Sequence, residues 1–177
     1  MIKRYTLPEM GAVWSEESKL NNWLQIEVAA CEAWAQLGKI PAASVETIKA
    51  KARFDVERIA EIEAEVRHDV IAFLTNVGEY VGDDAKYIHL GLTSSDILDT
   101  GIAMQMRDAA DIILAKLEEL QAAIKEKAIQ YKYTLCIGRT HGVHGEPTTF
   151  GLKMALWYTE MDRNIERLKQ AREVIAY

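Results

Sequence analysis

Residues 93–131 read TSSDILDTGIAMQMRDAADIILAKLEELQAAIKEKAIQY, a stretch with no proline and with a single glycine, Gly101. Its first residues offer several helix N-caps. Apolar side chains then recur at three- and four-residue steps, the period of one helix face; they are Ile113, Leu117, Leu120, Ile124, Ala128 and Tyr131. The stretch therefore predicts one helix that could approach 55 Å at ~1.5 Å per residue, far longer than a small domain needs.

A second long helix is expected after Pro147, because proline suits the first turn of a helix. Its apolar residues repeat at a spacing close to the heptad seam of a helical bundle; they are Met154, Tyr158, Met161, Ile165, Leu168 and Ile175. The pattern reaches Tyr177 without a cap, so we expect the sequence to stop inside a helix. Two such stripes need other helices to cover them, from further sequence or from neighbouring subunits.

Shorter helices are predicted in the first half of the chain. Ser15 followed by two glutamates is typical of a helix N-terminus, and Gly38 is typical of its end. Further helical patterns cover roughly 44–52, 55–66 and 69–81. The Gly82-Asp83-Asp84 run is expected to form a loop, and only Tyr133–Ile137 resembles a short extended piece. The fold class is therefore all-α.

Composition excludes several classes of function. The 177 residues include 49% hydrophobic and 27% charged side chains, which are ordinary values for a globular protein. With 21 Lys+Arg against 27 Asp+Glu, the net charge of −6 lacks the basic footprint of a nucleic-acid-binding protein. We expect neither a membrane span nor a signal peptide, and we expect Cys31 and Cys136 to form no disulfide framework. We expect a soluble, cytoplasmic protein that binds neither nucleic acid nor membranes.

Four histidines lie where the helical patterns are interrupted, namely His68, His89, His141 and His144. Histidine transfers protons near neutral pH, and loops often carry catalytic groups. Taken singly, each is better explained as a hydrogen-bonded structural residue. A metal site at His141 and His144 with Asp69 is a weaker alternative, because no HExxH or Cys/His cluster is present. The sequence contains no G-x-S-x-G motif, which argues against a serine hydrolase.

Hydroxyl and guanidinium groups favour an anionic ligand. The Thr93–Ser95 run stands at a predicted helix N-terminus, where hydroxyl and backbone N–H groups suit a carboxylate or phosphate. Arg4, Arg67 and Arg139 could pair with such anions in bidentate fashion. Helix capping and surface salt bridges explain the same residues individually. A helical oligomerisation module therefore stays open beside an enzyme.

Four segments together resemble the adenylosuccinate lyases, a family of the fumarase/aspartase superfamily. HLGLTSSDILDT (His89–Thr100) and GRTHGVHGEPTTFG (Gly138–Gly151) are similar to the first two conserved regions of that family. RYTLPEM (Arg4–Met10) and VRHDVIAF (Val66–Phe73) match it as well, in the expected order. Fumarases and aspartases typically carry a Gly-Gln-Ser-Ser-Asn-Asp type segment, and argininosuccinate lyases a Gly-Arg-Ser-Arg-Asn type, which differ from GLTSSD here. The resemblance covers essentially the whole chain.

The resemblance implies an all-α fold of the fumarase/aspartase type. An N-terminal helical domain would occupy residues 1–110, and the truncated start of a central long-helix bundle would occupy 111–177. The implied reaction is the β-elimination of fumarate from adenylosuccinate, which leaves AMP, and from the succinylated aminoimidazole carboxamide ribotide of purine biosynthesis. No metal or organic cofactor is implied. The implied assembly is a homotetramer with sites built from three subunits.

The same resemblance assigns residues to roles. His141 would be the general acid that protonates the departing nitrogen, and His68 a further catalytic residue. The implied substrate-binding residues are Arg4 and Tyr5 at the nucleotide phosphate, Thr93 and Ser94 at the succinyl carboxylates, and Arg67, His68, Asp69, His89 and Thr140 around the pocket. Lys86 is a weaker candidate.

One conserved region of the family is absent. It is a serine-containing loop of the Ser-Ser-x-Met-Pro-x-Lys-x-Asn-Pro type, which supplies the general base. We therefore expect an N-terminal portion of the enzyme that is inactive alone, with its base outside this chain. Another fumarase/aspartase lyase with a different succinyl substrate, and a non-catalytic helical oligomerisation module, remain the alternatives.

Overall fold

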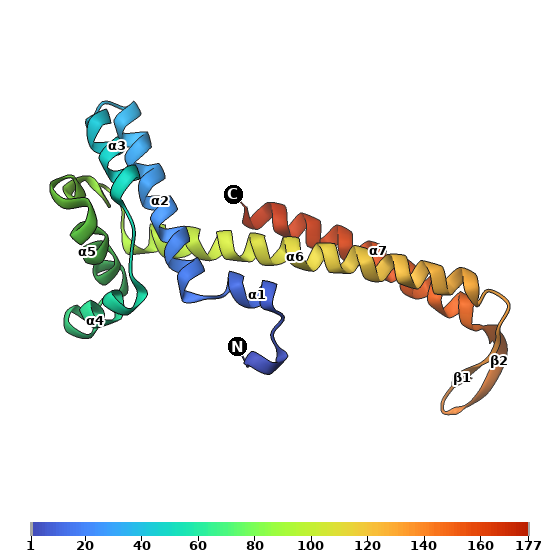
Figure 1. Ribbon diagram of the computed structural model, residues 1–177. Coiled ribbons are helices and arrows are strands. Elements are labelled where there is room, and N and C mark those ends of the chain that lie inside the picture. Colours follow the sequence, from blue (N-terminus) through green and yellow to red (C-terminus); the bar gives the residue numbers. More distant parts are fainter. Residues whose placement is uncertain (1, 177) are drawn as a thin grey trace. The chain divides into compact units, whose positions relative to one another are not determined.

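The computed structural model describes residues 2–176 and consists almost entirely of helices (Figure 1). The chain divides into two compact units, Met1–Met106 and Arg107–Tyr177. The all-α prediction is confirmed, with one small two-stranded sheet as the exception. None of the described helices has both the length and the apolar composition that crossing a membrane requires.

The first unit is built from short helices and the first turns of one long helix. Its elements are η1 (Lys3–Tyr5), α1 (Pro8–Val13), α2 (Glu16–Gln36), α3 (Ala42–Lys51), α4 (Val56–Val66), α5 (Asp69–Val81), η2 (Gly82–Tyr87) and the start of α6 (Ser94–Gln130). The Ser15 hydroxyl caps α2 by accepting the Ser18 backbone N–H, as predicted. The prediction of a loop at residues 82–84 is wrong, because a 3₁₀ helix forms there. A 3₁₀ helix of this length is too short to produce a periodic apolar pattern in the sequence, so the pattern could not predict it.

A closed hydrophobic core lies inside this unit. Phe73 of α5 is fully buried, and its ring packs edge-on against Trp23 of α2, with the centroids 5.6 Å apart. Gly101 of α6 permits this packing, because a Cβ at that position would lie 2.9 Å from Trp23 Cδ1. The remaining buried members of the core are Leu20, Cys31, Ile40, Val45, Ile48, Ile59, Ile62, Val70, Ala72, Val77, Val81 and Ile97.

The second unit pairs the rest of α6 with α7 (Phe150–Ile175). Ion pairs join Asp111 to Arg172 and Glu118 to Lys169, and a hydrogen bond joins Gln121 to Asp162. In these three pairs the α6 residue number increases as the α7 residue number decreases, so the two helices run antiparallel (Figure 1). The predicted pair of long helices is confirmed.

A β-hairpin connects α6 to α7. Strand β1 (Leu135–Thr140) pairs antiparallel with β2 (Val143–Thr149), and His141 and Gly142 form the connecting two-residue turn. This corrects two expectations. The extended piece runs to Thr140 rather than ending at Ile137, and Pro147 lies in β2 instead of starting the helix.

The helix start is set by a threonine rather than by the proline. Thr149 caps α7, and its Oγ1 accepts the Leu152 backbone N–H at 3.2 Å. Pro147 stands opposite Ile137, beside an irregularity in the strand register. Proline lacks the N–H of a ladder and is tolerated at such a place in an edge strand.

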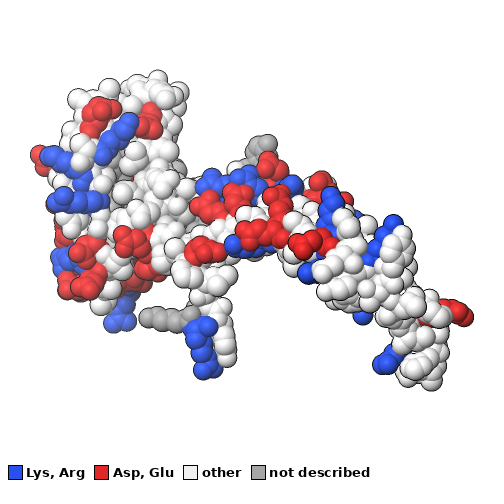
Figure 2. All heavy atoms as spheres, turned by 45° about the vertical axis from the view of Figure 1, so that its right-hand side comes forward, with Lys and Arg blue, Asp and Glu red and all other residues white. Residues whose placement is uncertain are grey.

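Apolar side chains of the second unit remain exposed over much of its length. Leu135 is 79% exposed and Leu152 is 65% exposed. On the face drawn in Figure 2, charges of both signs are interspersed along the paired helices, whereas the hairpin carries few of them. Its only charged residues are Arg139 and Glu146. In the described part of this unit, residues 107–176, the paired helices form a seam, and no residue of it belongs to the hydrophobic core cluster.

Candidate functional site

Three non-glycine residues of the described chain have a left-handed backbone, and all three belong to the site predicted from the sequence. They are Arg67 with φ of 57°, His89 with φ of 67° and His141 with φ of 51°. This conformation is uncommon for residues with a side chain, and such strain concentrates at functional sites. The backbone therefore singles out the same places as the sequence motifs.

His89 is held by a buried carboxylate. Its ring Nδ1 lies 2.6 Å from Glu27 Oε1, and its backbone N–H donates to Glu27 Oε2 at 2.8 Å. The Glu27 side chain is 1% exposed and the His89 side chain 20%. Burial raises the pKa of Glu27, and the contacts with His89 oppose that rise. The sequence analysis did not identify Glu27 as a site residue.

The helix α2 fixes the loop around His89 at two further points. Cys31 Sγ donates to the Tyr87 carbonyl at 3.5 Å, and Trp34 Nε1 donates to the Leu90 carbonyl at 2.7 Å. With Glu27 these residues follow steps of four and three, so they share one face of α2. Burial, together with the charge of Glu27, raises the pKa of the Cys31 thiol to about 11. The thiol thus has a packing role and little reactivity.

Thr93 precedes the first residue of α6. Its backbone N–H and its Oγ1 donate to Asp96 Oδ2 at 2.7 and 2.9 Å. These two hydrogen bonds are the main reason that the pKa of Asp96 lies below its usual value, and the charge of His89 contributes least. Thr93, Asp96 and His89 therefore lie close to one another at the start of α6, whose first residue is Ser94.

Arg67, His68 and Asp69 form the junction between α4 and α5. Arg67 ends α4 in its left-handed conformation. His68 caps α5, because its Nδ1 accepts the Ile71 backbone N–H at 3.4 Å, while Asp69 accepts the Val70 N–H at 2.8 Å. Nε2 of His68 is therefore the ring nitrogen left for a ligand, and the side chain is nearly half exposed.

His141 occupies the first position of the hairpin turn. It and Gly142 both have positive φ, which defines a type I′ turn, and Thr140 pairs with Val143 across it. His141 is exposed, and no hydrogen bond or ion pair from the described residues reaches its ring. The hairpin thus presents an imidazole at its tip.

Arg4 and Tyr5 lie in η1 near the start of the chain. The Arg4 guanidinium stacks over the Tyr5 ring, 4.8 Å from its centroid, and both side chains are exposed. Their local arrangement leaves the guanidinium donors directed to solvent or to a ligand.

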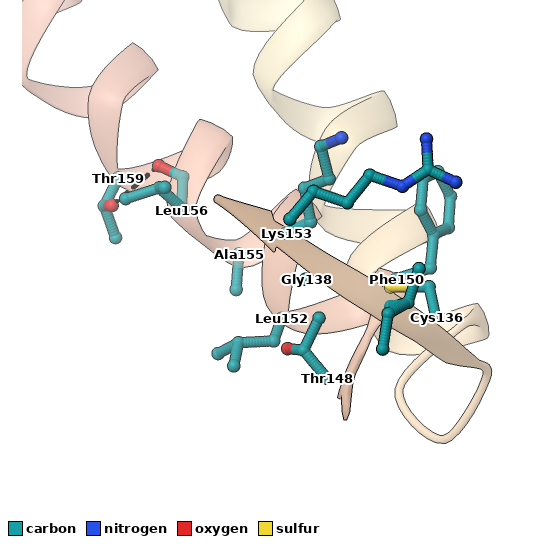
Figure 3. Close-up of a pocket in the computed structure, with 11 residues that line it drawn as sticks. Cys136, Gly138, Thr148, Phe150, Leu152, Lys153, Ala155, Leu156 and Thr159 are labelled. Atoms are coloured by element: carbon teal, nitrogen blue, oxygen red, sulfur yellow. Dashed lines mark hydrogen bonds between the residues drawn. The ribbon is translucent and has the colours of Figure 1, made fainter. Parts of the chain in front are cut away.

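An open groove of about 890 Å³ lies between the hairpin and the first turns of α7 (Figure 3). Its lining is mostly apolar and includes Ile137, Phe150, Leu152 and Leu156, together with Arg139. His141 does not line it. The groove is therefore a separate feature from the histidine at the hairpin tip.

The structure brings some predicted residues together and leaves others in separate places. In the first unit, His89 and Thr93 share one neighbourhood, while Arg67, His68 and Asp69 share the α4–α5 junction. His141 and Thr140 belong to the second unit. Across residues 2–176, no three His, Cys, Asp or Glu side chains are grouped to hold a metal ion.

Comparison with known proteins gives consistent results. A family model described as Lyase matches residues 3–177. Adenylosuccinate lyase from Synechocystis sp. is 59% identical over 176 residues, which are 99% of this chain and 41% of that protein. Adenylosuccinate lyase from Bacillus subtilis is 53% identical over 172 residues, which are 97% of this chain and 40% of that protein. The chain therefore spans about two fifths of the length of these relatives.

Solved structures of two differently named enzymes have a similar fold. A fumarate lyase from Mesorhizobium sp. BNC1 superposes with a TM-score of 0.86 at 31% identity, over 91% of this chain and 39% of its own. A 3-carboxy-cis,cis-muconate lactonizing enzyme from Pseudomonas putida superposes with a TM-score of 0.88 at 32% identity, over 97% and 41%. The fold is thus shared across different chemistries.

Proposed function

The chain belongs to the lyase family, and from that premise we propose that it is the N-terminal portion of an adenylosuccinate lyase. The observation that carries the proposal is the similarity to adenylosuccinate lyases, which extends over nearly the whole chain at more than half of its positions. The intact enzyme would release fumarate from adenylosuccinate and from the succinylated aminoimidazole carboxamide ribotide of purine biosynthesis. We place this enzyme in the cytoplasm.

The reaction is a β-elimination. A base removes a proton from the succinyl carbon beside a carboxylate, and the new C=C bond of fumarate forms as the adjacent C–N bond breaks. The departing nitrogen keeps the electron pair of that bond and takes a proton from a positioned acid. His141 is the acid in this proposal, because its ring is exposed at the tip of the hairpin and free to meet a substrate. The base would come from outside this chain.

Substrate binding falls to polar groups at helix ends. Ser94 and Thr93 stand at the N-terminus of α6, where backbone N–H groups and the helix dipole favour the succinyl carboxylates. Arg4 and Tyr5 would meet the phosphate. Arg67, His68, Asp69, His89 and Thr140 would line the remainder of the pocket, with His68 also acting in catalysis through its free Nε2.

A homotetramer would complete the protein. The exposed apolar residues of α6 and α7, such as Ile113 and Leu156, support this proposal, because long helical seams are stable when other helices cover them. Such an assembly would also bring residues of several subunits to one site.

The test uses the full-length protein that contains this chain. Fumarate release from adenylosuccinate is followed by absorbance in the wild type and in His141→Ala. We expect the variant to lose about two to four orders of magnitude in turnover, as is usual when a general acid is removed. His144→Ala changes another exposed histidine of the same hairpin and is the matched control, with turnover expected to stay within about threefold.

Three outcomes would contradict the proposal. A loss below about tenfold in His141→Ala would mean that another group protonates the leaving nitrogen. Turnover of argininosuccinate or aspartate with adenylosuccinate ignored would indicate another lyase. An ordered oligomer that binds no nucleotide would indicate an interaction module.

The 177-residue chain alone should release no fumarate, and measurable release would contradict that expectation.

A further inference from the structure

We propose that Glu27 is a positioning residue, which orients His89 so that its Nε2 faces the anionic substrate. The inference rests on the proposed function for the identity of the substrate. Glu27 lies on α2, 62 residues before His89 in the sequence, and the two meet through a pair of hydrogen bonds.

Both oxygens of the carboxylate serve the same residue. Oε2 accepts the backbone N–H of His89, and Oε1 lies 2.6 Å from the ring Nδ1, which donates when Glu27 is ionised. The first contact holds the backbone of His89 in its left-handed conformation, with φ of 67°. The second contact restricts rotation of the ring about the side-chain torsions. A residue held at both its main chain and its side chain has little freedom left, which is what positioning of a binding group requires.

The direction of Nε2 follows from the shape of imidazole. Nδ1 and Nε2 lie on different sides of the ring, so a ring that directs Nδ1 into the core directs Nε2 away from it. The His89 side chain is 20% exposed, and no hydrogen bond within residues 2–176 reaches Nε2. When Nε2 carries a proton it becomes a donor for an anion, and the buried carboxylate then balances the positive charge of the ring.

Folding alone does not explain a carboxylate at this place. Cys31 and Trp34 already attach the Tyr87 and Leu90 carbonyls to α2 on either side of His89. Burying a carboxylate costs free energy unless a partner compensates it. Within residues 2–176, the partner that opposes the rise in the pKa of Glu27 is His89, through its ring and its backbone N–H. The carboxylate is therefore matched to the imidazole.

The kinetic test compares Glu27→Gln with Trp34→Phe in the full-length protein. The glutamine removes the charge and leaves one acceptor oxygen where the carboxylate offers two to His89. We expect KM for adenylosuccinate to rise about 10- to 100-fold, the range for one lost charge-assisted hydrogen bond, with kcat within about threefold. Trp34→Phe removes a neutral hydrogen bond to the same loop and is the matched control. We expect its KM to rise less than about threefold, and an equal rise in both variants would overturn the proposal.

A double-mutant cycle shows whether Glu27 acts through His89. In a His89→Ala background, Glu27→Gln should cause no further rise in KM. A rise as large as in the wild-type background would overturn the proposal. Repeating the cycle with the dephosphorylated analogue succinyladenosine assigns the anion, since the effect disappears if Nε2 meets the phosphate and persists if it meets a carboxylate.

A spectroscopic measurement does not depend on lyase activity. In the full-length protein with ¹⁵N-labelled histidine, the resonances lost in His89→Ala should show a proton on Nδ1, and Glu27→Gln, whose single oxygen cannot accept from both the backbone N–H and Nδ1–H, should weaken that protonation. An unchanged tautomer would overturn the proposal. If the protein ignores adenylosuccinate but this result holds, the proposed function fails and the positioning role stands. Glu27→Asp, which keeps the charge, should restore part of the effect and serves if the glutamine variant folds poorly.

Discussion

The two units of this chain use amphipathic helices in different ways. In the first, the apolar faces of α2, α3, α4 and α5 enclose one another, and Val70, Phe73 and Val77 are completely buried. In the second, α6 and α7 form one antiparallel pair, and large apolar residues such as Leu135 and Val174 are more than three quarters exposed. An apolar stripe in a sequence therefore predicts a helix face that needs burial, but it does not show that the same chain supplies the cover.

The candidate site residues differ between the units in the same manner. In the first unit each histidine has a hydrogen-bonding partner, Glu27 for His89 and the Ile71 backbone for His68. In the second unit His141 stands exposed on a hairpin turn. The first unit holds its site residues in place with its own core, while the second presents a residue whose surroundings must be completed by something else.

The largest expected effect is on the core of the first unit. Phe73→Ala should lower the free energy of unfolding by about 3–5 kcal/mol, because it removes a buried aromatic ring and leaves a cavity. Leu152→Ala, at a position 65% exposed in the second unit, should change it by less than about 0.5 kcal/mol. Denaturant unfolding of the chain measures both. A large cost at Leu152 would mean that the second unit is covered after all, for example by self-association.

Thiol reactivity offers the next test of the comparison. The pKa of Cys31 is raised to about 11, so about one thiol in a thousand is ionised at pH 8, and the residue is also buried. Cys136 lies on β1 and is partly exposed. We expect iodoacetamide to modify Cys136 at least a hundredfold faster in the native chain, as measured by mass spectrometry. Equal modification rates for the two thiols would show that the first unit opens readily.

The helices could be predicted from the sequence because their apolar periodicity is a property of the chain itself. The patterns at 55–66 and 69–81 correspond to α4 and α5 within one residue. The hairpin could not be predicted in this way. Alternation marks a strand when one face is buried, and β1 and β2 are mostly exposed on both faces. Pro147 was a misleading cue, because a strand edge tolerates proline as readily as a first helical turn does.

The motifs in the sequence predicted the candidate site residues that lie within them, and they gave no indication of Glu27, which lies outside them. Glu27 lies on the same α2 face as Cys31 and Trp34, so its position in an apolar stripe was the available clue. A glutamate in a helix is normally solvated, and its partner His89 is 62 residues away. Contacts over such a distance depend on tertiary packing, which periodicity does not encode.

A smaller effect is expected from two glycines. A Cβ at Gly151 would lie 2.6 Å from the Ala128 carbonyl oxygen and 2.6 Å from Lys132 Cα, both of them backbone atoms. Gly151→Ala should therefore destabilise the junction of α6 and α7 by about 1–3 kcal/mol. Gly78→Ala in α5 is the matched change, because its Cβ would meet Ala85 Cβ at an ordinary 3.6 Å. It should stabilise the chain by about 0.5–1 kcal/mol. Loss of stability at Gly78 would show that the first unit is packed more tightly than these contacts indicate.

The smallest effects are pH slopes, and they should have opposite signs in the two units. In the second unit, the Arg172 guanidinium lowers the pKa of Asp111 below its ordinary 3.8. Below that value the unfolded chain binds the proton more readily, so this pair stabilises the fold at higher pH and its contribution is lost as the pH falls. In the first unit, burial raises the pKa of Glu27 above 4.5. There the folded chain holds the proton more tightly, so stability decreases as the pH rises above that value.

Each slope can be removed separately by an isosteric change. Asp111→Asn should flatten the dependence of unfolding free energy on pH below 3.8, and Glu27→Gln should flatten the opposite dependence above 4.5. Urea unfolding across a series of pH values measures both. The exposed pair should respond to added salt, since screening weakens surface charges, whereas the buried carboxylate should respond little. If the pH dependence removed by Glu27→Gln is sensitive to salt, water reaches the Glu27 carboxylate. The first unit would then not be closed around the carboxylate that is proposed to position His89, and the contrast with the open second unit would not hold there.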